Sequence, residues 1–268
     1  MDLLHEKKKK LEELLGSFGS AAIAFSGGVD STFLLCEARA VLMERAVAVT
    51  VRSESFPSRE MREAEEFCRS LKVRHHVLDF RQLEMEEFAR NPRNRCYLCK
   101  KALFLGIRDF AHSLGLAEVA EGSNVDDAGD YRPGLLALKE LAIRSPLKEA
   151  GLTKADIRLL SREMNLPTWD KPSYACLATR FVYGENITAE RLRMVERAEQ
   201  FLQDLGFRQE RVRIHGGTLA RIEVLPEDLR EVLRERDVIT EKFRSFGFTY
   251  VTLDLLGFRT GSMNETLS

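Results

Sequence analysis

Long apolar runs are missing from this sequence, so nothing in it predicts a membrane-spanning helix, and its first residues show no signal-peptide pattern. The sequence also has no excess of one charge, because it contains 41 Lys and Arg residues and 42 Asp and Glu residues, which gives a formal net charge of −1. This balance gives no broad basic surface for a nucleic-acid backbone, although a local cluster of arginines can still bind a small anion. We therefore expect a cytoplasmic protein that has neither a membrane nor a nucleic acid as a partner.

The sequence also lacks the cysteine pattern of a disulfide framework, since 268 residues contain five cysteines, an odd number. This predicts a reducing compartment in which the thiols serve chemistry or metal binding. Hydrophobic residues make up 44% of the chain and charged residues 31%, which is typical of a globular protein. No internal repeat and no low-complexity segment interrupts the sequence.

Strand patterns and helix patterns alternate over the first two-thirds of the chain. Short apolar strands are expected at residues 21–25, 46–51, 75–80 and 117–122, with helical patterns between them. This alternation predicts an α/β fold, a doubly wound parallel sheet that occupies residues 1–185. Ligands of such sheets bind outside the carboxyl ends of the strands.

The pattern changes after Arg180. A helix is expected over residues 189–205, and the following stretch "RVRIHGGTLARIEV" indicates two strands joined by a Gly-Gly turn. A further helix and the strand "FTYVTLDL" complete a smaller α+β domain over residues 186–268. We expect this domain to serve substrate binding or oligomerisation.

The stretch "FSGGVDS" follows the first expected strand and opens the first helix. Gly27 and Gly28 have no side chains, so backbone N–H groups can approach an anion closely, and the helix N-terminus adds a favourable dipole. Ser26 and Ser31 add hydroxyl groups. The competing interpretation is a glycine turn in which Asp30 or Ser31 caps the helix. The strand-loop-helix context favours phosphate binding, although the loop has neither the lysine of GxxxxGK[ST] nor the spacing of GxGxxG.

This loop resembles the SGGxDS PP-loop of the ATP pyrophosphatases. The resemblance implies that ATP is cut between its α and β phosphates while a substrate is adenylated. Asp30 would help to hold Mg²⁺, which prefers oxygen ligands together with phosphates. The loop "GSNVDDAGDYRPG" follows an expected strand at the sheet edge where ligands bind, so Asp127 would orient ATP or Mg²⁺ and Arg132 would contact phosphate; the competing interpretation is a solvated turn. The ATP-binding residues expected from the resemblance are Ser26, Gly27, Gly28, Val29, Asp30, Ser31 and Asp127.

The five cysteines fall into two groups. Cys36 and Cys68 lie within helical patterns and are expected to pack in the core. Cys96 and Cys99 have CxxC spacing at a helix start, which favours thiolates and suits two ligands of one metal centre. The alternative is a pair of unconnected surface thiols. Cys176 lies in the polar loop "TWDKPSYACLATRF", and three thiolates without a histidine suit a 4Fe–4S cluster with one open iron better than a four-ligand zinc site.

A set of motifs in this order resembles the LarE family of ATP-dependent sulfur transferases: "SGGVDS", "NRCYLCK", "EGSNVDDAGDYRPG", "SPL", "WDKPSYACLATRFVYG" and "LLGFRTGSMNE". The family helps to make the nickel-pincer nucleotide cofactor of lactate racemase. The resemblance implies that a carboxylate of pyridinium-3,5-biscarboxylic acid mononucleotide is adenylated and becomes a thiocarboxylate. In one branch of the family the cysteine matching Cys176 gives up its own sulfur. In another branch three cysteines hold a 4Fe–4S cluster, and the presence of Cys96 and Cys99 favours that branch.

Arginines are expected around a substrate that carries carboxylates and a phosphate. Arg180 follows Cys176 closely. Arg211 and Arg213 alternate on one strand and would share a face, with Glu223 beside them; the competing interpretation is an exposed strand face carrying ordinary ion pairs. No role follows for Arg259 and Glu265 beyond a contact in a homo-oligomer. The expected substrate-binding residues are Arg180, Arg211, Arg213 and Glu223.

Three other functions compete with sulfur transfer to a small nucleotide. A PP-loop enzyme that thiolates tRNA would need a broad basic surface or an RNA-binding module. An amide-forming synthetase would need no cysteine. A nucleotide-binding regulator would bind ATP without releasing pyrophosphate.

Overall fold

The computed structural model describes residues 3–129 and 134–267. The chain forms two compact units, which we describe one at a time. Unit 1 comprises residues 1–80 and 94–174, and unit 2 comprises residues 81–93 and 175–268. Within the described residues, no helix is long and apolar enough to cross a membrane.

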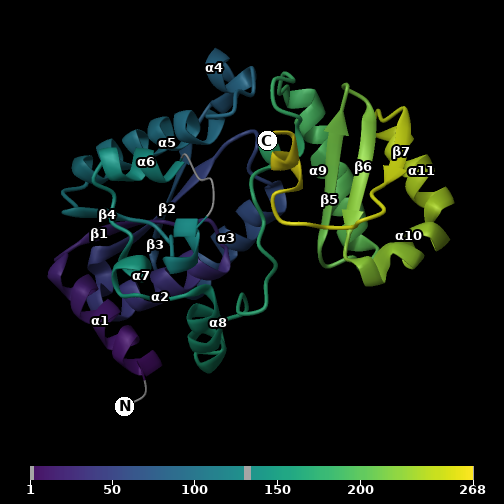
Figure 1. Ribbon diagram of the computed structural model, residues 1–268. Coiled ribbons are helices and arrows are strands. Elements are labelled where there is room, and N and C mark those ends of the chain that lie inside the picture. The colour runs from purple at the N-terminus through teal and green to yellow at the C-terminus, as the bar shows by residue number, and fades with distance from the viewer. Residues whose placement is uncertain (1–2, 130–133, 268) are drawn as a thin grey trace. The chain divides into compact units, whose positions relative to one another are not determined.

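Unit 1 is built on a parallel four-stranded sheet in the order β3-β2-β1-β4 (Figure 1). The strands are β1 (Ala21–Ala24), β2 (Ala46–Arg52), β3 (Arg74–Asp79) and β4 (Glu118–Ala120). The helices are α1 (Leu3–Ser17), α2 (Val29–Leu42), α3 (Ser58–Ser70), α5 (Arg95–Ser113), α6 (Gly134–Glu140), α7 (Pro146–Glu149) and α8 (Lys154–Glu163). All four strands predicted for this part of the sequence are present and parallel, which confirms the predicted fold class.

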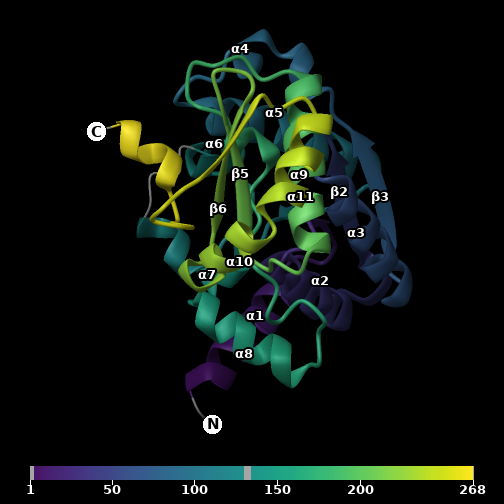
Figure 2. The same ribbon diagram turned by 90° about the vertical axis from the view of Figure 1, so that its right-hand side faces the viewer.

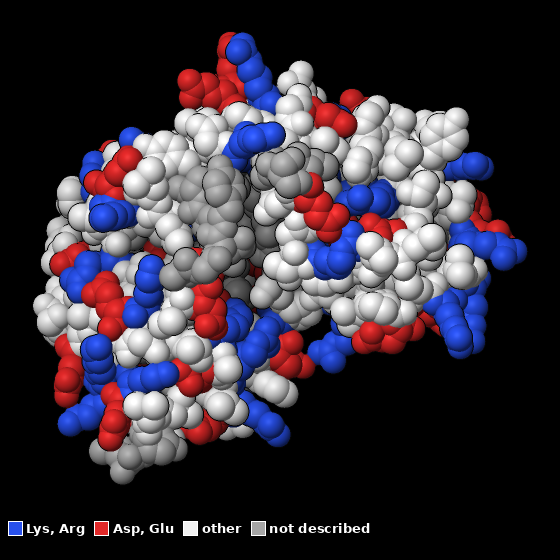
Figure 3. Space-filling view, viewed as in Figure 1, with Lys and Arg blue, Asp and Glu red and all other residues white. Residues whose placement is uncertain are grey.

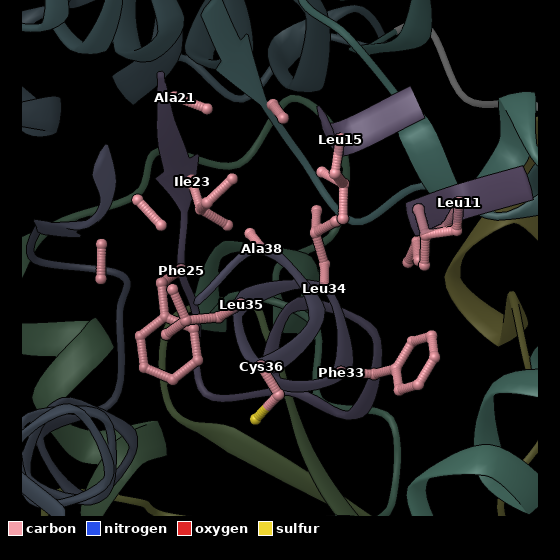
Figure 4. Close-up of a cluster of buried hydrophobic side chains, with 14 of the residues drawn as sticks. Leu11, Leu15, Ala21, Ile23, Phe25, Phe33, Leu34, Leu35, Cys36 and Ala38 are labelled. Atoms are coloured by element: carbon pink, nitrogen blue, oxygen red, sulfur yellow. The ribbon is translucent and has the colours of Figure 1, made fainter. Parts of the chain in front are cut away.

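The sheet of unit 1 is covered by helices on both faces, and successive residues of each strand serve opposite faces. Ala21 and Ile23 of β1 pack with Leu34 of α2 in one buried cluster, shown in Figure 4. Ala22, between them, belongs to a second cluster with Phe104 of α5. Because both faces of the central strand β1 and of most of β2 are buried, these strands are mainly apolar. The edge strand β3 instead carries charged and polar residues and has no fully buried residue.

Unit 2 contains a three-stranded mixed sheet in the order β5-β6-β7. Strands β5 (Glu210–His215) and β6 (Leu219–Val224) are antiparallel, whereas β7 (Tyr250–Leu253) runs parallel to β6. Gly216 and Gly217 have φ of 56° and 96° in the turn between β5 and β6, conformations that side chains oppose, so the predicted Gly-Gly turn is confirmed. The helices are α4 (Glu86–Ala89), α9 (Ala189–Asp204), α10 (Leu229–Arg234) and α11 (Arg236–Ser245), and Figure 2 shows α9 and α11 beside the sheet.

The short segment 81–93 joins unit 2 through Asn91, which is fully buried. The Asn91 side-chain amide donates to the backbone carbonyl of Val182 over 2.6 Å. The backbone carbonyl of Asn91 accepts from the N–H of Gly184 over 2.9 Å. These bonds satisfy buried polar groups of the loop that precedes α9.

Candidate active site

The loop "SGGVDS" joins the carboxyl end of β1 to the start of α2. Gly28 is the residue before the helix, and no side chain caps it. The interpretation in which Asp30 or Ser31 caps the helix is therefore wrong, since both lie inside α2. The N–H groups of the first helical turn have no intrahelical partners, and together with the dipole they make a site for an anion.

The two serines of this loop brace each other. The hydroxyl oxygens of Ser26 and Ser31 lie 3.1 Å apart, and the Ser31 hydroxyl donates to the Gly28 carbonyl over 3.2 Å. Gly27 has φ of 71°, a conformation that a side chain would strain, and a Cβ atom there would lie 3.5 Å from the Cβ of Ala64 on α3. The loop is therefore held in one shape before any nucleotide binds.

Asp30 is paired with a lysine that the sequence patterns did not indicate. The Lys154 ammonium lies 2.6 Å from Oδ2 of Asp30, and the Asn124 side-chain amide donates to Oδ1 over 3.4 Å. Lys154 is the first residue of α8, and its backbone N–H donates to Asp126 over 2.8 Å. The sequence around Lys154 indicates only the start of a helix, because Thr153 and Asp156 form a capping box; it does not indicate the pairing with Asp30.

The loop after β4 lies near this cluster through Asn124. The backbone N–H of Asn124 donates to the Asp127 carboxylate over 2.9 Å, and the Asn124 side chain accepts from the N–H of Asp126 over 2.9 Å. The structure thus brings Asp30 and the Asn124–Asp127 loop to the carboxyl edge of the sheet, as the sequence predicted for a ligand site. Arg132, which was expected to contact phosphate, lies outside the described residues.

The cysteines separate by burial as expected. Cys36 and Cys68 lie in the core of unit 1, where burial, and secondarily nearby charges, raises the pKa of each thiol to about 12. Cys96 and Cys99 lie in the first turns of α5 and are half-buried. Their i, i+3 spacing places them on one face of the helix. In the part of the chain that the structure describes, no three His, Cys, Asp or Glu side chains are grouped to hold a metal ion.

Cys176 lies in unit 2 at the start of a 3-10 turn, Leu177–Arg180, and is half-buried. Arg180, at the end of this turn, is 1% exposed. Its guanidinium donates to the carbonyls of Ala175 and Cys176 over 3.0 and 3.3 Å and forms a two-point pair with Glu199 of α9 at 2.8 and 2.9 Å. Arg180 therefore fixes the backbone on which Cys176 is carried.

Arg211 and Arg213 are both buried on β5, so the competing interpretation of an exposed strand face is wrong. Arg213 donates to the Glu223 carboxylate over 2.8 Å, and burial, opposed by that pairing, lowers the pKa of Arg213. The Arg211 guanidinium lies over the ring of Phe258, 5.2 Å from its centre. Burial first, and then the charge of Arg180, lowers the pKa of Arg211 to about 10. Arg211 and Arg213 thus belong to a buried network of charges in unit 2, in which Glu223 pairs with Arg213 and the charges of Glu199 and Glu210 oppose the lowering of the pKa of Arg211.

Arg259 and Glu265, for which the sequence predicted no role, form ion pairs near the end of the chain. Arg259 forms an ion pair with Glu265 at 3.1 Å and with Asp254, just after β7, at 3.3 Å. The segment after β7 is thereby held beside the small sheet.

Residues 11–98 match the asparagine synthase family model. The pyridinium-3,5-bisthiocarboxylic acid mononucleotide synthase of Lactiplantibacillus plantarum is 37% identical over all of this chain and 97% of its own length. An uncharacterized Synechocystis protein is 40% identical over 99% of this chain and all of its own length. An uncharacterized Methanocaldococcus jannaschii protein is 30% identical over 89% of this chain and 90% of its own. The similarity to the first two relatives therefore extends over essentially the whole chain, including both units.

Proposed function

We propose that this chain, which belongs to the LarE family of pyridinium-3,5-bisthiocarboxylic acid mononucleotide synthases, is an ATP-dependent sulfurtransferase. The observation that carries the proposal is the start of α2 at Val29, within the stretch Ser26–Ser31. No side chain caps this helix end, so its free N–H groups suit the phosphates of ATP. The substrate is pyridinium-3,5-biscarboxylic acid mononucleotide, and the product carries a thiocarboxylate in place of a carboxylate. This product is a precursor of the nickel-pincer nucleotide cofactor of lactate racemase.

The first step is adenylation. A carboxylate oxygen of the substrate attacks the α-phosphorus of ATP, the bond from that phosphorus to the bridging oxygen breaks, and pyrophosphate leaves. The N–H groups of Gly28, Val29 and Asp30 stabilise the charge that develops on the phosphates. The Asp30 carboxylate has the hard oxygen donors that Mg²⁺ requires, and Asp127 would orient the nucleotide from the neighbouring loop.

The second step is sulfur transfer. A sulfur nucleophile attacks the acyl carbon, and AMP leaves with the electron pair of the broken bond. If Cys176 is the donor, its Sγ forms a thioester. Loss of the Cα proton then breaks the Cβ–S bond, which leaves dehydroalanine in the chain and a thiocarboxylate on the substrate.

We favour the branch in which Cys96, Cys99 and Cys176 together hold a 4Fe–4S cluster. Their thiols are half-buried, unlike those of Cys36 and Cys68, and thiolates suit iron–sulfur chemistry. When bound, such a cluster supplies an open iron that can carry an extra sulfide. Anaerobic purification followed by iron and sulfide analysis tests this: iron-free protein after reconstitution rejects the cluster, and loss of one H₂S at Cys176 after turnover supports the other route.

On the substrate side we propose that Arg211 and Arg213 bind the phosphate, with Glu223 orienting Arg213 and Arg180 acting through the Cys176 backbone. We propose residues 1–185 as the ATP-activating part and residues 186–268 as the part that serves substrate and assembly into a homo-oligomer. On the face drawn in Figure 3, Lys and Arg side chains are interspersed with Asp and Glu, which favours a small-molecule substrate over tRNA.

The decisive experiment separates the two steps. Cys176→Ala is expected to release pyrophosphate in the presence of substrate and to form no thiocarboxylate. Cys68→Ala, which changes a packing cysteine, is the matched control and should form the product. Full sulfur transfer by the Cys176 variant would reject the role proposed for Cys176. Amide formation from ammonia by that variant would favour an amide-forming synthetase, and tight binding of bulk tRNA at physiological salt would favour tRNA thiolation.

A further inference from the structure

The Lys-Pro pair in "WDKPSYAC" has no part in the chemistry described above, yet its lysine reaches the nucleotide loop. Lys171 lies in the irregular segment after α8, and its side chain is 14% exposed. Its ammonium donates to the carbonyl oxygen of Gly27 over 3.2 Å. It also donates to Glu60 and to Glu63, both over 2.7 Å. Three acceptors thus satisfy the three donors of one ammonium.

The two carboxylates come from one face of α3, the helix against which Gly27 packs. Glu60 and Glu63 are three residues apart in the helix and lie side by side. Burial raises the pKa of Glu60 although the charge of Lys171 opposes the shift. Arg59 also pairs with Glu63 at 2.8 Å, but Lys171 is the cation that contacts both carboxylates and the Gly27 carbonyl, so it links α3 to the loop.

The backbone that carries Lys171 is itself fixed. Arg158 of α8 donates to the carbonyl of Trp169 over 2.6 Å and to that of Lys171 over 2.8 Å. Pro172 follows and disfavours helical backbone at Lys171. The backbone of Lys171 is therefore held in place by Arg158 while its ammonium contacts the Gly27 carbonyl.

The contact with the Gly27 carbonyl has a consequence for anion binding. The peptide bond between Gly27 and Gly28 is planar and trans, so its carbonyl and its N–H point in opposite directions. A carbonyl held against Lys171 keeps its negative oxygen away from the phosphates and directs the Gly28 N–H to the other side. A glycine loop without this restraint can rotate the peptide and present the oxygen instead.

We propose that Lys171 is a positioning residue of the nucleotide site, which orients the Gly27–Gly28 peptide so that its N–H faces the phosphates of ATP. The proposal rests on the proposed function only in that ATP binds at this loop. Lys171 acts through the loop and transfers no group.

The test measures the Kd for ATP by calorimetry in the full chain, because binding needs neither substrate nor a sulfur donor. Lys171→Met leaves Glu60 without the cation it contacts and Glu63 with Arg59 alone, so it is combined with Glu60→Gln and Glu63→Gln in a triple variant that removes the repulsion. Glu60→Gln with Glu63→Gln alone is the matched control, since it keeps the contact between Lys171 and Gly27. Lys171→Arg preserves a cation that can donate to the same carbonyl.

We expect the triple variant to melt near the wild-type temperature and to bind ATP about tenfold to a hundredfold more weakly, the effect of misdirecting one hydrogen bond to a charged group. The double variant should bind ATP within about threefold of wild type, and Lys171→Arg should recover most of the loss. A triple variant with the wild-type Kd would overturn the proposal and leave Lys171 as a counter-charge for α3. A wild-type chain that binds ATP but forms no thiocarboxylate would reject the sulfurtransferase function alone, and one that binds no ATP would overturn both.

Discussion

Replacing Arg180 by Met should destabilise the protein strongly and slow sulfur transfer, because the side chain supports the Cys176 backbone from inside unit 2. The change keeps an unbranched apolar stem but removes the guanidinium with its charge and donors. The Glu199 carboxylate, 4% exposed, then loses its cation. Burial disfavours the ionised form of Glu199, but Arg180 outweighs this and holds the pKa of Glu199 below its ordinary value.

The expected cost follows from these contacts. A buried carboxylate that loses its partner costs about 3–5 kcal/mol, and the carbonyls of Ala175 and Cys176 lose a donor as well. The loop of Cys176 is then free to change conformation, so we expect thiocarboxylate formation to fall while ATP binding stays within about twofold of wild type.

Urea unfolding followed by circular dichroism measures the free energy of unfolding of Arg180→Met, Glu199→Gln and the double variant. Because the double variant buries no uncompensated charge, it should cost about 2–3 kcal/mol less than the sum of the two single variants. Glu199→Gln keeps an oxygen to accept from the Val212 N–H, now 2.8 Å away. If the single costs add to within about 0.5 kcal/mol, the pair is not coupled and the reasoning is refuted.

Three further predictions concern other parts of the molecule. Burial, and then the charge of Glu199, raises the pKa of Glu210 to about 8, so the folded state holds a proton that the unfolded state releases near pH 4.5. The free energy of unfolding should therefore decline from about pH 4.5 to about pH 8. Glu210→Gln should flatten this decline, measured by melting curves at several pH values. Thr153→Ala removes the capping box with Asp156 and should lower the free energy of unfolding by about 1 kcal/mol, whereas Thr153→Ser should retain it. Gly27→Ala forces a side chain into φ of 71° and should cost about 1–2 kcal/mol and weaken ATP binding in calorimetry; unchanged values for both would contradict the described loop conformation.

Local patterning in the sequence was sufficient to locate the four parallel strands, the Gly-Gly turn and the glycine loop that opens α2. Each depends on neighbours along the chain: short runs of apolar residues in strands of 3–7 residues, glycines that accept positive φ, and a helix that starts directly after a loop. The two core cysteines were also predictable, because their helices have apolar residues at helical spacing. The competing interpretation of an exposed strand face for Arg211 and Arg213 was wrong, since burial of an arginine depends on partners that a strand pattern does not contain.

The sequence by itself therefore determined where the nucleotide loop begins, which strands surround it and which cysteines are outside the core. Only the tertiary structure decided how the polar groups pair. Lys154 meets Asp30 across 124 residues and Lys171 meets the Gly27 carbonyl across 144. Long side chains reach such partners only after the sheet has brought distant segments to one edge, and a buried charge is stable only where its counter-charge and donors are already in place.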